Sequence, residues 1–221
     1  MSESAAFLFL GGVMAVVIGL LLRQTLSVRP WTVQGIGEAP PEAGFLPTVK
    51  IGLWVFLAVV TSLFALFISA YSMRMAAGDW EPLPEPALLW LNTAVLILTS
   101  VVMQWTLVAA RRANREGVRI GLNAAGALTF AFLAGQLAVW QQLSGSGFLM
   151  VANPANAFFY LLTALHGLHL VGGLVAWART VARVRRGATL GEIRLHVGLC
   201  AAYWHFLLLI WLVLFALLLS T

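Results

Sequence analysis

Three histidines are the residues of this chain best suited to chemistry within an apolar segment. His166 and His169 lie three residues apart in an uncharged run from Phe158 to Ala178, and His205 lies in a later apolar run. Residues three apart share one face of a helix, so the first two imidazoles are expected on a common face. Because a polar side chain in a membrane is costly, each histidine needs a partner or a function.

The residues alone leave three interpretations of these histidines open. They form buried hydrogen bonds between helices, they carry protons, or His169 or His166 pairs with His205 as ligands of a haem. Counting 1.5 Å per residue from the predicted helix ends places His169 about 14 Å and His205 about 12 Å from the same membrane surface. No Asp, Glu, Lys or Arg lies in the interior of a predicted helix; Lys50 stands only at the edge of one. This absence disfavours an ion-coupled transporter or a proton pump that operates through this chain.

The composition predicts a polytopic membrane protein. Of 221 residues, 61% are hydrophobic and 10% are charged, whereas soluble domains carry about 25% charged residues. The mean hydropathy is +0.93, and the longest hydrophilic interval, residues 23–48, is too short for a soluble catalytic domain. The single cysteine, Cys200, excludes an internal disulfide and a cysteine-rich metal site. Arginines at predicted helix ends explain the pI near 10.4 better than nucleic-acid binding does.

Six apolar runs have about the 20 residues that a membrane-spanning helix needs. They are Ala5–Leu22, Val49–Tyr71, Pro86–Ala109, Ile120–Trp140, Phe158–Ala178 and Val197–Leu219. We therefore predict an all-α transmembrane bundle in two parts. Residues 1–48 would form an extra N-terminal helix with a Pro/Gly-rich cytoplasmic linker, and residues 49–221 a five-helix bundle. The first run has no basic flank and no cleavage site, so we expect it to be retained rather than removed as a signal peptide.

Lysine and arginine predict the orientation of the chain. Twelve of the 13 lie in the connections after the first, third and fifth runs, and only Arg74 lies on the other side. The positive-inside rule places these connections in the cytoplasm and both termini on the outer, periplasmic side. Five of the arginines either contact anionic lipid headgroups or act only as topology signals; they are Arg111, Arg112, Arg183, Arg185 and Arg186.

Five segments between Lys50 and Phe215 resemble, in order, subunit III of the haem–copper oxidases, the cytochrome c oxidase subunit 3 family. The matching positions are Trp54, Phe56, Asn92, Thr93, Ser100, Gln136, Trp140, His166, Gly167, His169, Gly173, Tyr203, Trp204, His205 and Trp211. Each segment alone is short, but five in the family's order, each on a predicted helix, form a specific pattern. The resemblance implies structural roles for these residues, and neither catalytic nor metal-binding ones.

The chain departs from the family pattern at three positions that are commonly acidic. Val60, Val139 and Leu208 stand there. The resemblance therefore implies a divergent member and gives no support for a role in proton supply. The five segments do not include the first apolar run or its linker, although longer members have two extra N-terminal helices that enclose a lipid-filled cleft.

The resemblance implies a multi-pass subunit of a respiratory terminal oxidase in a bacterial plasma membrane, without catalytic activity of its own. It would stabilise the catalytic subunit I and hold structural phospholipid. The haems and copper would lie in partner subunits, which are subunit I, subunit II and a small subunit IV. The complex would reduce oxygen in aerobic electron transport and translocate protons. The alternatives are an accessory subunit of a nitric oxide reductase-like enzyme and a b-haem membrane anchor that uses His169 and His205.

If the cofactors lie in a partner, the histidine pair needs a structural role. We expect His166 and His169 to fasten the fifth helix to the fourth and sixth through buried hydrogen bonds. Gly167, Gly172 and Gly173 would let a neighbouring helix, or a lipid tail, approach the fifth helix closely.

Overall fold

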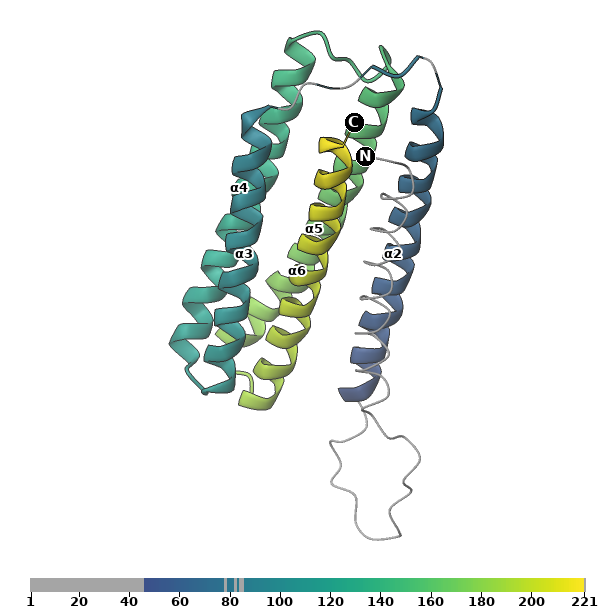
Figure 1. The fold of residues 1–221 in the computed structure, drawn as a ribbon. Coiled ribbons are helices and arrows are strands. Elements are labelled where there is room, and N and C mark those ends of the chain that lie inside the picture. Colours follow the sequence, from purple (N-terminus) through teal and green to yellow (C-terminus); the bar gives the residue numbers. More distant parts are fainter. Residues whose placement is uncertain (1–45, 78, 82, 84–85, 221) are drawn as a thin grey trace, which may run out of the picture. The chain divides into compact units, whose positions relative to one another are not determined.

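The computed structural model describes residues 46–220, apart from residues 78, 82 and 84–85. Within these ranges the chain forms five helices and no strand, and all five are long and apolar enough to cross a membrane (Figure 1). They are α2 (Leu46–Met75), α3 (Ala87–Arg111), α4 (Arg115–Gly145), α5 (Pro154–Arg185) and α6 (Leu190–Leu219). The all-helical prediction is confirmed for this part of the chain. The predicted helix Ala5–Leu22, and with it the count of six, lies outside the described residues.

The helices extend beyond the apolar runs that predicted them. α5 begins at Pro154 and ends at Arg185, and α6 begins at Leu190 instead of Val197. The predicted basic loops are therefore mostly helical, and only short turns join α3 to α4 and α5 to α6. α5 has 32 residues, which makes it about 48 Å long against about 30 Å of hydrocarbon. Its arginine-bearing end therefore reaches into the headgroup region, where a charged helix end is stable.

Side-chain caps fix the helix ends at the α3–α4 turn. The Asn114 side chain accepts a hydrogen bond from the Gly117 N–H at 2.9 Å, at the start of α4. Arg194 of α6 donates to the carbonyls of Ala110 and Arg111, at 3.2 and 3.0 Å, at the end of α3. These groups have no partner within their own helices, so the caps stabilise the ends and join α6 to α3.

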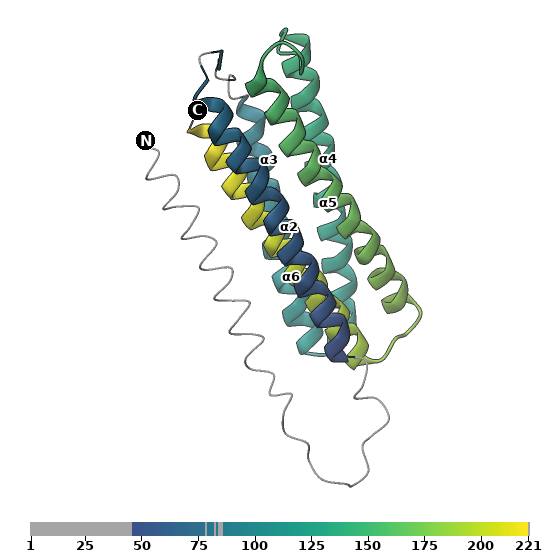
Figure 2. The same ribbon diagram turned by 90° about the vertical axis from the view of Figure 1, so that its right-hand side faces the viewer.

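Helices α3, α4, α5 and α6 pack in a closed ring. α3 and α5 each lie against both α4 and α6, and Figures 1 and 2 show the four side by side from two directions. The largest fully buried side chains of this ring include Phe132, Phe159, Trp204 and Trp211. The residues from Phe56 to Leu219 belong to one compact unit.

Within this unit, the part of helix α2 from Phe56 onward contacts α5 through aromatic rings. The Phe64 ring lies 5.5 Å from the His169 ring, and the Tyr71 ring lies 5.5 Å from that of Phe158. Buried residues of α2 recur at helical spacing on one face; they are Leu57, Val60, Phe64, Ile68 and Tyr71. This periodicity is the expected pattern for one side of a helix turned toward protein.

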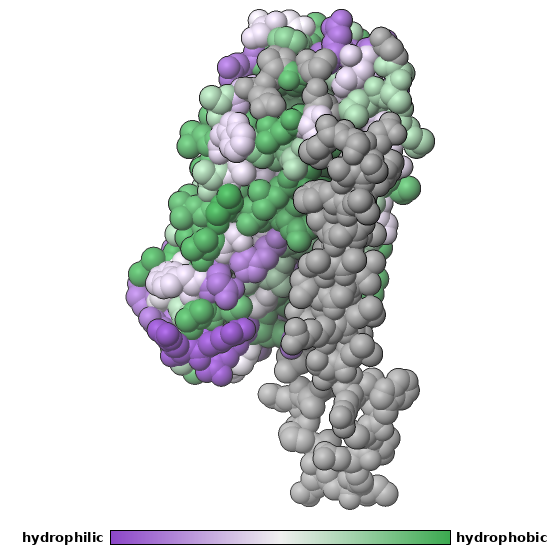
Figure 3. Space-filling model, viewed as in Figure 1, coloured by the Kyte–Doolittle hydropathy of each residue, from purple (hydrophilic) through white to green (hydrophobic). Residues whose placement is uncertain are grey.

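Two short turns and their arginines define one end of the described bundle, which we call the arginine end. It holds the α3–α4 and α5–α6 turns, and the exposed side chains there include Arg111, Arg112 and Arg186. Figure 3 shows hydrophilic residues gathered at the lower end of the visible face and apolar residues over most of its middle. We call the opposite end, with the α2–α3 and α4–α5 connections, the loop end.

The three glycines of α5 make different contacts. A Cβ at Gly173 would lie 2.7 Å from Cε1 of Tyr203, whereas one at Gly167 would only touch Leu133 at 3.8 Å. A Cβ at Gly172 would have no atom within 4 Å. The close helix approach is therefore found at Gly173. Gly167 makes only an ordinary contact with α4, and Gly172 is exposed and contacts no other helix among those that the structure describes.

These adjacent glycines provide a matched test. We expect Gly173→Ala to lower the free energy of unfolding by about 1–3 kcal/mol, because the Tyr203 ring must move. Gly172→Ala should leave stability unchanged or raise it, since Ala favours a helix over Gly by up to about 1 kcal/mol. Thermal unfolding of the full chain in detergent measures both. Equal stability of the two variants would contradict the packing.

Candidate functional site: polar contacts between the helices

Tryptophan indoles fasten neighbouring helices by donating to threonine hydroxyls. The pairs are Trp140 of α4 with Thr163 of α5 (3.1 Å), Trp204 of α6 with Thr129 of α4 (3.1 Å), and Trp211 of α6 with Thr93 of α3 (3.0 Å). Each threonine also donates its hydroxyl proton to the carbonyl four residues earlier in its own helix, at 2.7–2.8 Å. One hydroxyl thus acts as donor within its helix and as acceptor between helices, which satisfies both polar groups.

His166 is completely buried between α4 and α6. Its ring meets Phe132 edge-on at 5.9 Å and lies 5.1 Å from Trp211. Neither ring nitrogen has a hydrogen-bond partner among the described residues. His166 does connect α5 to α4 and α6, but our prediction of buried hydrogen bonds is wrong. The two neighbouring positions are occupied by aromatic rings, and the Trp211 N–H is already donated to Thr93.

His169 is turned toward α2 instead. Its Nδ1 lies 2.7 Å from the carbonyl oxygen of Leu165 in its own helix, and its ring contacts Phe64 and Phe56. The connection to α6 at this residue comes from the backbone, since the Tyr203 hydroxyl donates to the His169 carbonyl at 2.9 Å. The imidazole of His169 therefore does not form the predicted bond to α4 or α6.

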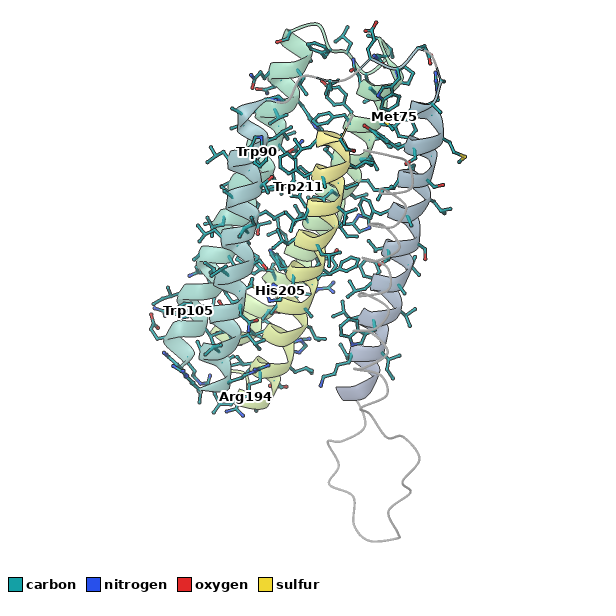
Figure 4. The ribbon with its side chains drawn as sticks, viewed as in Figure 1. Met75, Trp90, Trp105, Arg194, His205 and Trp211 are labelled. Atoms are coloured by element: carbon teal, nitrogen blue, oxygen red, sulfur yellow. The ribbon has the colours of Figure 1, made fainter. Side chains whose placement is uncertain are left out.

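His205 is held by α3. Its Nδ1 is hydrogen-bonded to the Ser100 hydroxyl, and its Nε2 lies 3.1 Å from Oε1 of Gln104 (Figure 4). Both ring nitrogens of His205 are therefore engaged by α3. A haem held between two histidines needs a free nitrogen on each, so His205 does not fit that arrangement.

Two amide side chains meet in the core between α3 and α4. The Asn92 amide donates to Oε1 of Gln136 at 3.5 Å, and both residues are buried. Nε2 of Gln136 has no partner among the described residues. This contact joins the second and third segments of the predicted pattern, so Asn92 and Gln136 lie together as members of one interface.

Connections at the loop end are tied by polar contacts. Arg74 donates to both carboxylate oxygens of Asp79, at 2.6 and 2.5 Å, and this guanidinium holds the pKa of the exposed Asp79 carboxyl below its usual value. The Asn153 side chain, which also caps α5, donates to the Glu81 carbonyl at 3.1 Å. The α4–α5 connection is thereby joined to the α2–α3 connection.

Two residues of the family pattern, Trp54 and Phe56, lie on α2, and two positions where the chain departs from that pattern lie in the core. Trp54 is half-buried on α2, and Phe56 lies 6.1 Å from the Tyr203 ring. Val60 and Val139, at two positions that are commonly acidic in the family pattern, are buried. An aliphatic side chain needs no partner there, whereas a carboxylate would.

Comparison with known proteins identifies the family. The sequence model of "Cytochrome c oxidase subunit III" matches residues 6–220. The chain belongs to the cytochrome c oxidase subunit III family. The match also covers most of the N-terminal segment. It is therefore longer than the stretch from Lys50 to Phe215 that contains the five resembling segments.

Relatives in this family are similar over most of their length. Cytochrome c oxidase subunit 3 of Synechocystis sp. is 31% identical over 188 residues, which are 82% of this chain and 79% of that protein. The subunit 3 of Thermostichus vulcanus is 31% identical over 192 residues, 84% of this chain and 94% of that protein. The probable cytochrome c oxidase subunit 3 of Mycobacterium bovis is 30% identical over 172 residues, 76% and 85% of the two chains.

Sequence reasoning missed several residues of these contacts. Thr129, Phe132 and Gln104 were not singled out, although each contacts a histidine or tryptophan that was. The available signal is weak: an isolated Thr, Phe or Gln in an apolar run has no spacing that marks its partner. Only the fold shows which of them face a donor on another helix.

The threonine–tryptophan contacts can be tested with two similar threonines. Thr129→Val removes the acceptor of the Trp204 indole and should lower the free energy of unfolding by about 0.6–2 kcal/mol. Thr61 donates only to the Leu57 carbonyl in its own helix, so Thr61→Val is the control and should cost less. Unfolding of the full chain in mixed micelles measures both. Equal losses would show that the interhelical bond contributes nothing.

Proposed function

We propose that this chain is a non-catalytic integral membrane subunit of a respiratory haem–copper terminal oxidase. It would stabilise the catalytic subunit and hold structural phospholipid at its surface. The observation that carries the proposal is the family match over residues 6–220. The geometry supports it, because His166, His205, Trp204 and Trp211 are engaged in contacts that fasten α-helices to one another.

The redox centres of such a complex would lie in partner subunits. Subunit I, with haems and copper, would be the main contact, and subunit II and a small subunit IV would complete the assembly. The complex would reduce oxygen and translocate protons in aerobic respiration. Ser100 and Gln104 engage both ring nitrogens of His205, so this histidine has no free nitrogen for a haem iron. This observation supports the proposal that the haems are bound by a partner subunit.

Co-purification tests this proposal. The full chain, affinity-tagged and extracted mildly from native membranes, should bring down a haem–copper subunit in stoichiometric amount with oxygen-reducing activity. The chain stripped of partners should show no Soret band. A complex without a haem–copper polypeptide would contradict the proposal, and so would a stoichiometric Soret band of the isolated chain that disappears in His205→Ala. A complex that reduces nitric oxide instead of oxygen would favour the alternative enzyme.

We also propose that the arginine end faces the cytoplasm of a bacterial cell and that both termini lie outside. The excess of arginine at this end supports that orientation. Val151, in the α4–α5 connection, is 92% exposed, and Arg186, in the α5–α6 turn, is exposed. In intact spheroplasts an impermeant maleimide should label Val151→Cys, and should label Arg186→Cys only after permeabilisation. Native Cys200 is buried. The reverse labelling would overturn the orientation.

Arginines at this end are proposed to bind the headgroups of anionic phospholipids. The side chains of Arg111, Arg112, Arg185 and Arg186 are exposed and have no hydrogen bond or ion pair within the described part of the chain. Arg183 is tied to the His196 ring, with Nη1 2.9 Å from Nδ1, and is the least available of the five. Each free guanidinium near an anionic surface contributes roughly 1 kcal/mol.

Lipid mass spectrometry of the purified complex tests these contacts. Replacement of Arg111, Arg112, Arg185 and Arg186 by Gln should remove most of the co-purified phosphatidylglycerol or cardiolipin, because the headgroups lose their cationic partners. Arg119→Gln is the control, since Arg119 is already paired with Glu116 at 3.0 Å. Unchanged lipid retention in the fourfold variant would leave these arginines as topology signals only.

A further inference from the structure

One amide side chain interrupts the exposed apolar face of α3. Gln104 is exposed, and its neighbours on this face, Leu98, Val101 and Trp105, are large apolar residues that are about half exposed or more. Figure 3 shows a hydrophilic patch within the apolar part of the visible face. Figure 4 places Trp105 on the outside of α3 and His205 on the neighbouring α6.

The position of Gln104 along α3 places it inside the hydrocarbon layer. α3 has 25 residues, Ala87–Arg111, and its midpoint is Thr99. At a rise of 1.5 Å per residue, Gln104 lies about 7.5 Å from this midpoint. The hydrocarbon extends about 15 Å to each side of the bilayer centre. A phospholipid headgroup would therefore have to descend several ångströms to reach the amide.

The hydrogen bonds of His205 leave half of this amide unused. One neutral tautomer satisfies both contacts: Nε2–H donates to Oε1 of Gln104, and Nδ1 accepts from the Ser100 hydroxyl. The two N–H groups of Gln104 then have no partner in the described part of the chain. In the flipped orientation one amide N–H would donate to Nε2 of His205, and the amide oxygen and the second N–H would be left without a partner.

Hydroxyl side chains elsewhere on these helices do not leave a donor unpaired. Thr61, Ser62 and Ser72 of α2 each donate to the carbonyl four residues earlier, as the buried threonines do. A glutamine amide has two donors and an acceptor, and among the residues that the structure describes the Gln104 amide is bonded only to His205. Acyl chains offer neither donor nor acceptor, so an exposed amide at this depth needs a polar group from protein.

We propose that the surface made by Leu98, Val101, Gln104, Trp105 and His205, which we call the α3 amide face, docks a membrane-spanning helix of a partner subunit. That helix would present a hydrogen-bond acceptor, such as a hydroxyl, carboxyl or free carbonyl oxygen, to the Gln104 amide. Trp105 is 49% exposed beside it and supplies the kind of aromatic anchor that is enriched at interfaces. This inference deepens the proposed function, on which it rests.

The exposed face of α5 differs and serves as a comparison. Leu161, Leu168, Val171 and Val175 are exposed there, and these apolar side chains are compatible with lipid. Leu168 is 65% and Val101 is 59% exposed. Each lies within about 3 Å of the midpoint of its helix. The two positions are therefore matched in depth and exposure, and only Val101 is on the α3 amide face.

Photo-crosslinking in the native membrane tests the docking surface. The photoreactive residue benzoylphenylalanine, placed at Val101 of the full chain, should crosslink to a membrane-spanning polypeptide of the co-purified complex. At Leu168 it should give no polypeptide adduct. Adducts to lipid only, an adduct to a second copy of this chain, or equal polypeptide adducts from both positions would each overturn the inference.

Removal of the amide gives a second, independent measurement. Gln104→Leu should accelerate dissociation of the chain from its complex in detergent by about threefold to thirtyfold, the range expected for one hydrogen bond within a membrane. Gln142→Leu, an identical change at an exposed position near the end of α4, should leave the rate unchanged. Equal rates for both variants and the parent chain would overturn the inference.

The outcomes separate this inference from the proposed function. Failure to co-purify any haem–copper subunit contradicts the proposed function. Co-purification with crosslinks from Leu168 but none from Val101 keeps the proposed function and overturns the docking surface alone.

Discussion

The packing of this bundle depends on threonine hydroxyls that serve two helices at once. Lipid tails are as apolar as leucine, so burial of apolar surface does little to hold membrane helices together. An indole N–H can only donate, and inside the bundle it must meet an acceptor. Thr93 and Thr129 provide acceptors for Trp211 and Trp204 while donating to their own backbones. Two indoles on α6 thereby fix its position against both α3 and α4.

This use of polar groups explains how histidines and tryptophans at membrane depth can serve the packing of the helices. His166 fills a space between aromatic rings, and His205 bonds α6 to α3. Neither stands in an acid–base pair. The chain belongs to the cytochrome c oxidase subunit III family, and under the function proposed above such a bundle would offer helix faces to the partner subunits.

Much of the fold could be predicted from the sequence, because long uncharged runs can satisfy their backbone in a membrane only as helices. Helix ends could not, since charged residues such as Arg185 stay helical beyond the hydrocarbon. The His166–His169 spacing was also misleading. Three residues turn a helix by about 300°, so the side chains diverge by about 60°. That angle is enough for His166 to meet α6 and for His169 to meet α2.

The contacts that matter most were the hardest to predict. Thr129 and Gln104 are isolated in apolar runs, and nothing in their spacing identifies Trp204 or His205 as partners. Such pairs follow from the rotation of each helix about its axis, which hydropathy does not determine. The family resemblance singled out the tryptophans and histidines as structural positions, but only the three-dimensional arrangement gave their partners.

A double-mutant cycle between Thr93 and Trp211 tests the central claim most directly. The cycle compares the free energies of unfolding of the full chain with Thr93→Val, with Trp211→Phe and with both changes. It isolates the pairwise term from the cavity that the smaller ring leaves. The account predicts a coupling of about 0.6–1.7 kcal/mol in favour of the native pair. Strictly additive effects would contradict it, because they would mean that the indole and the hydroxyl stabilise the bundle independently.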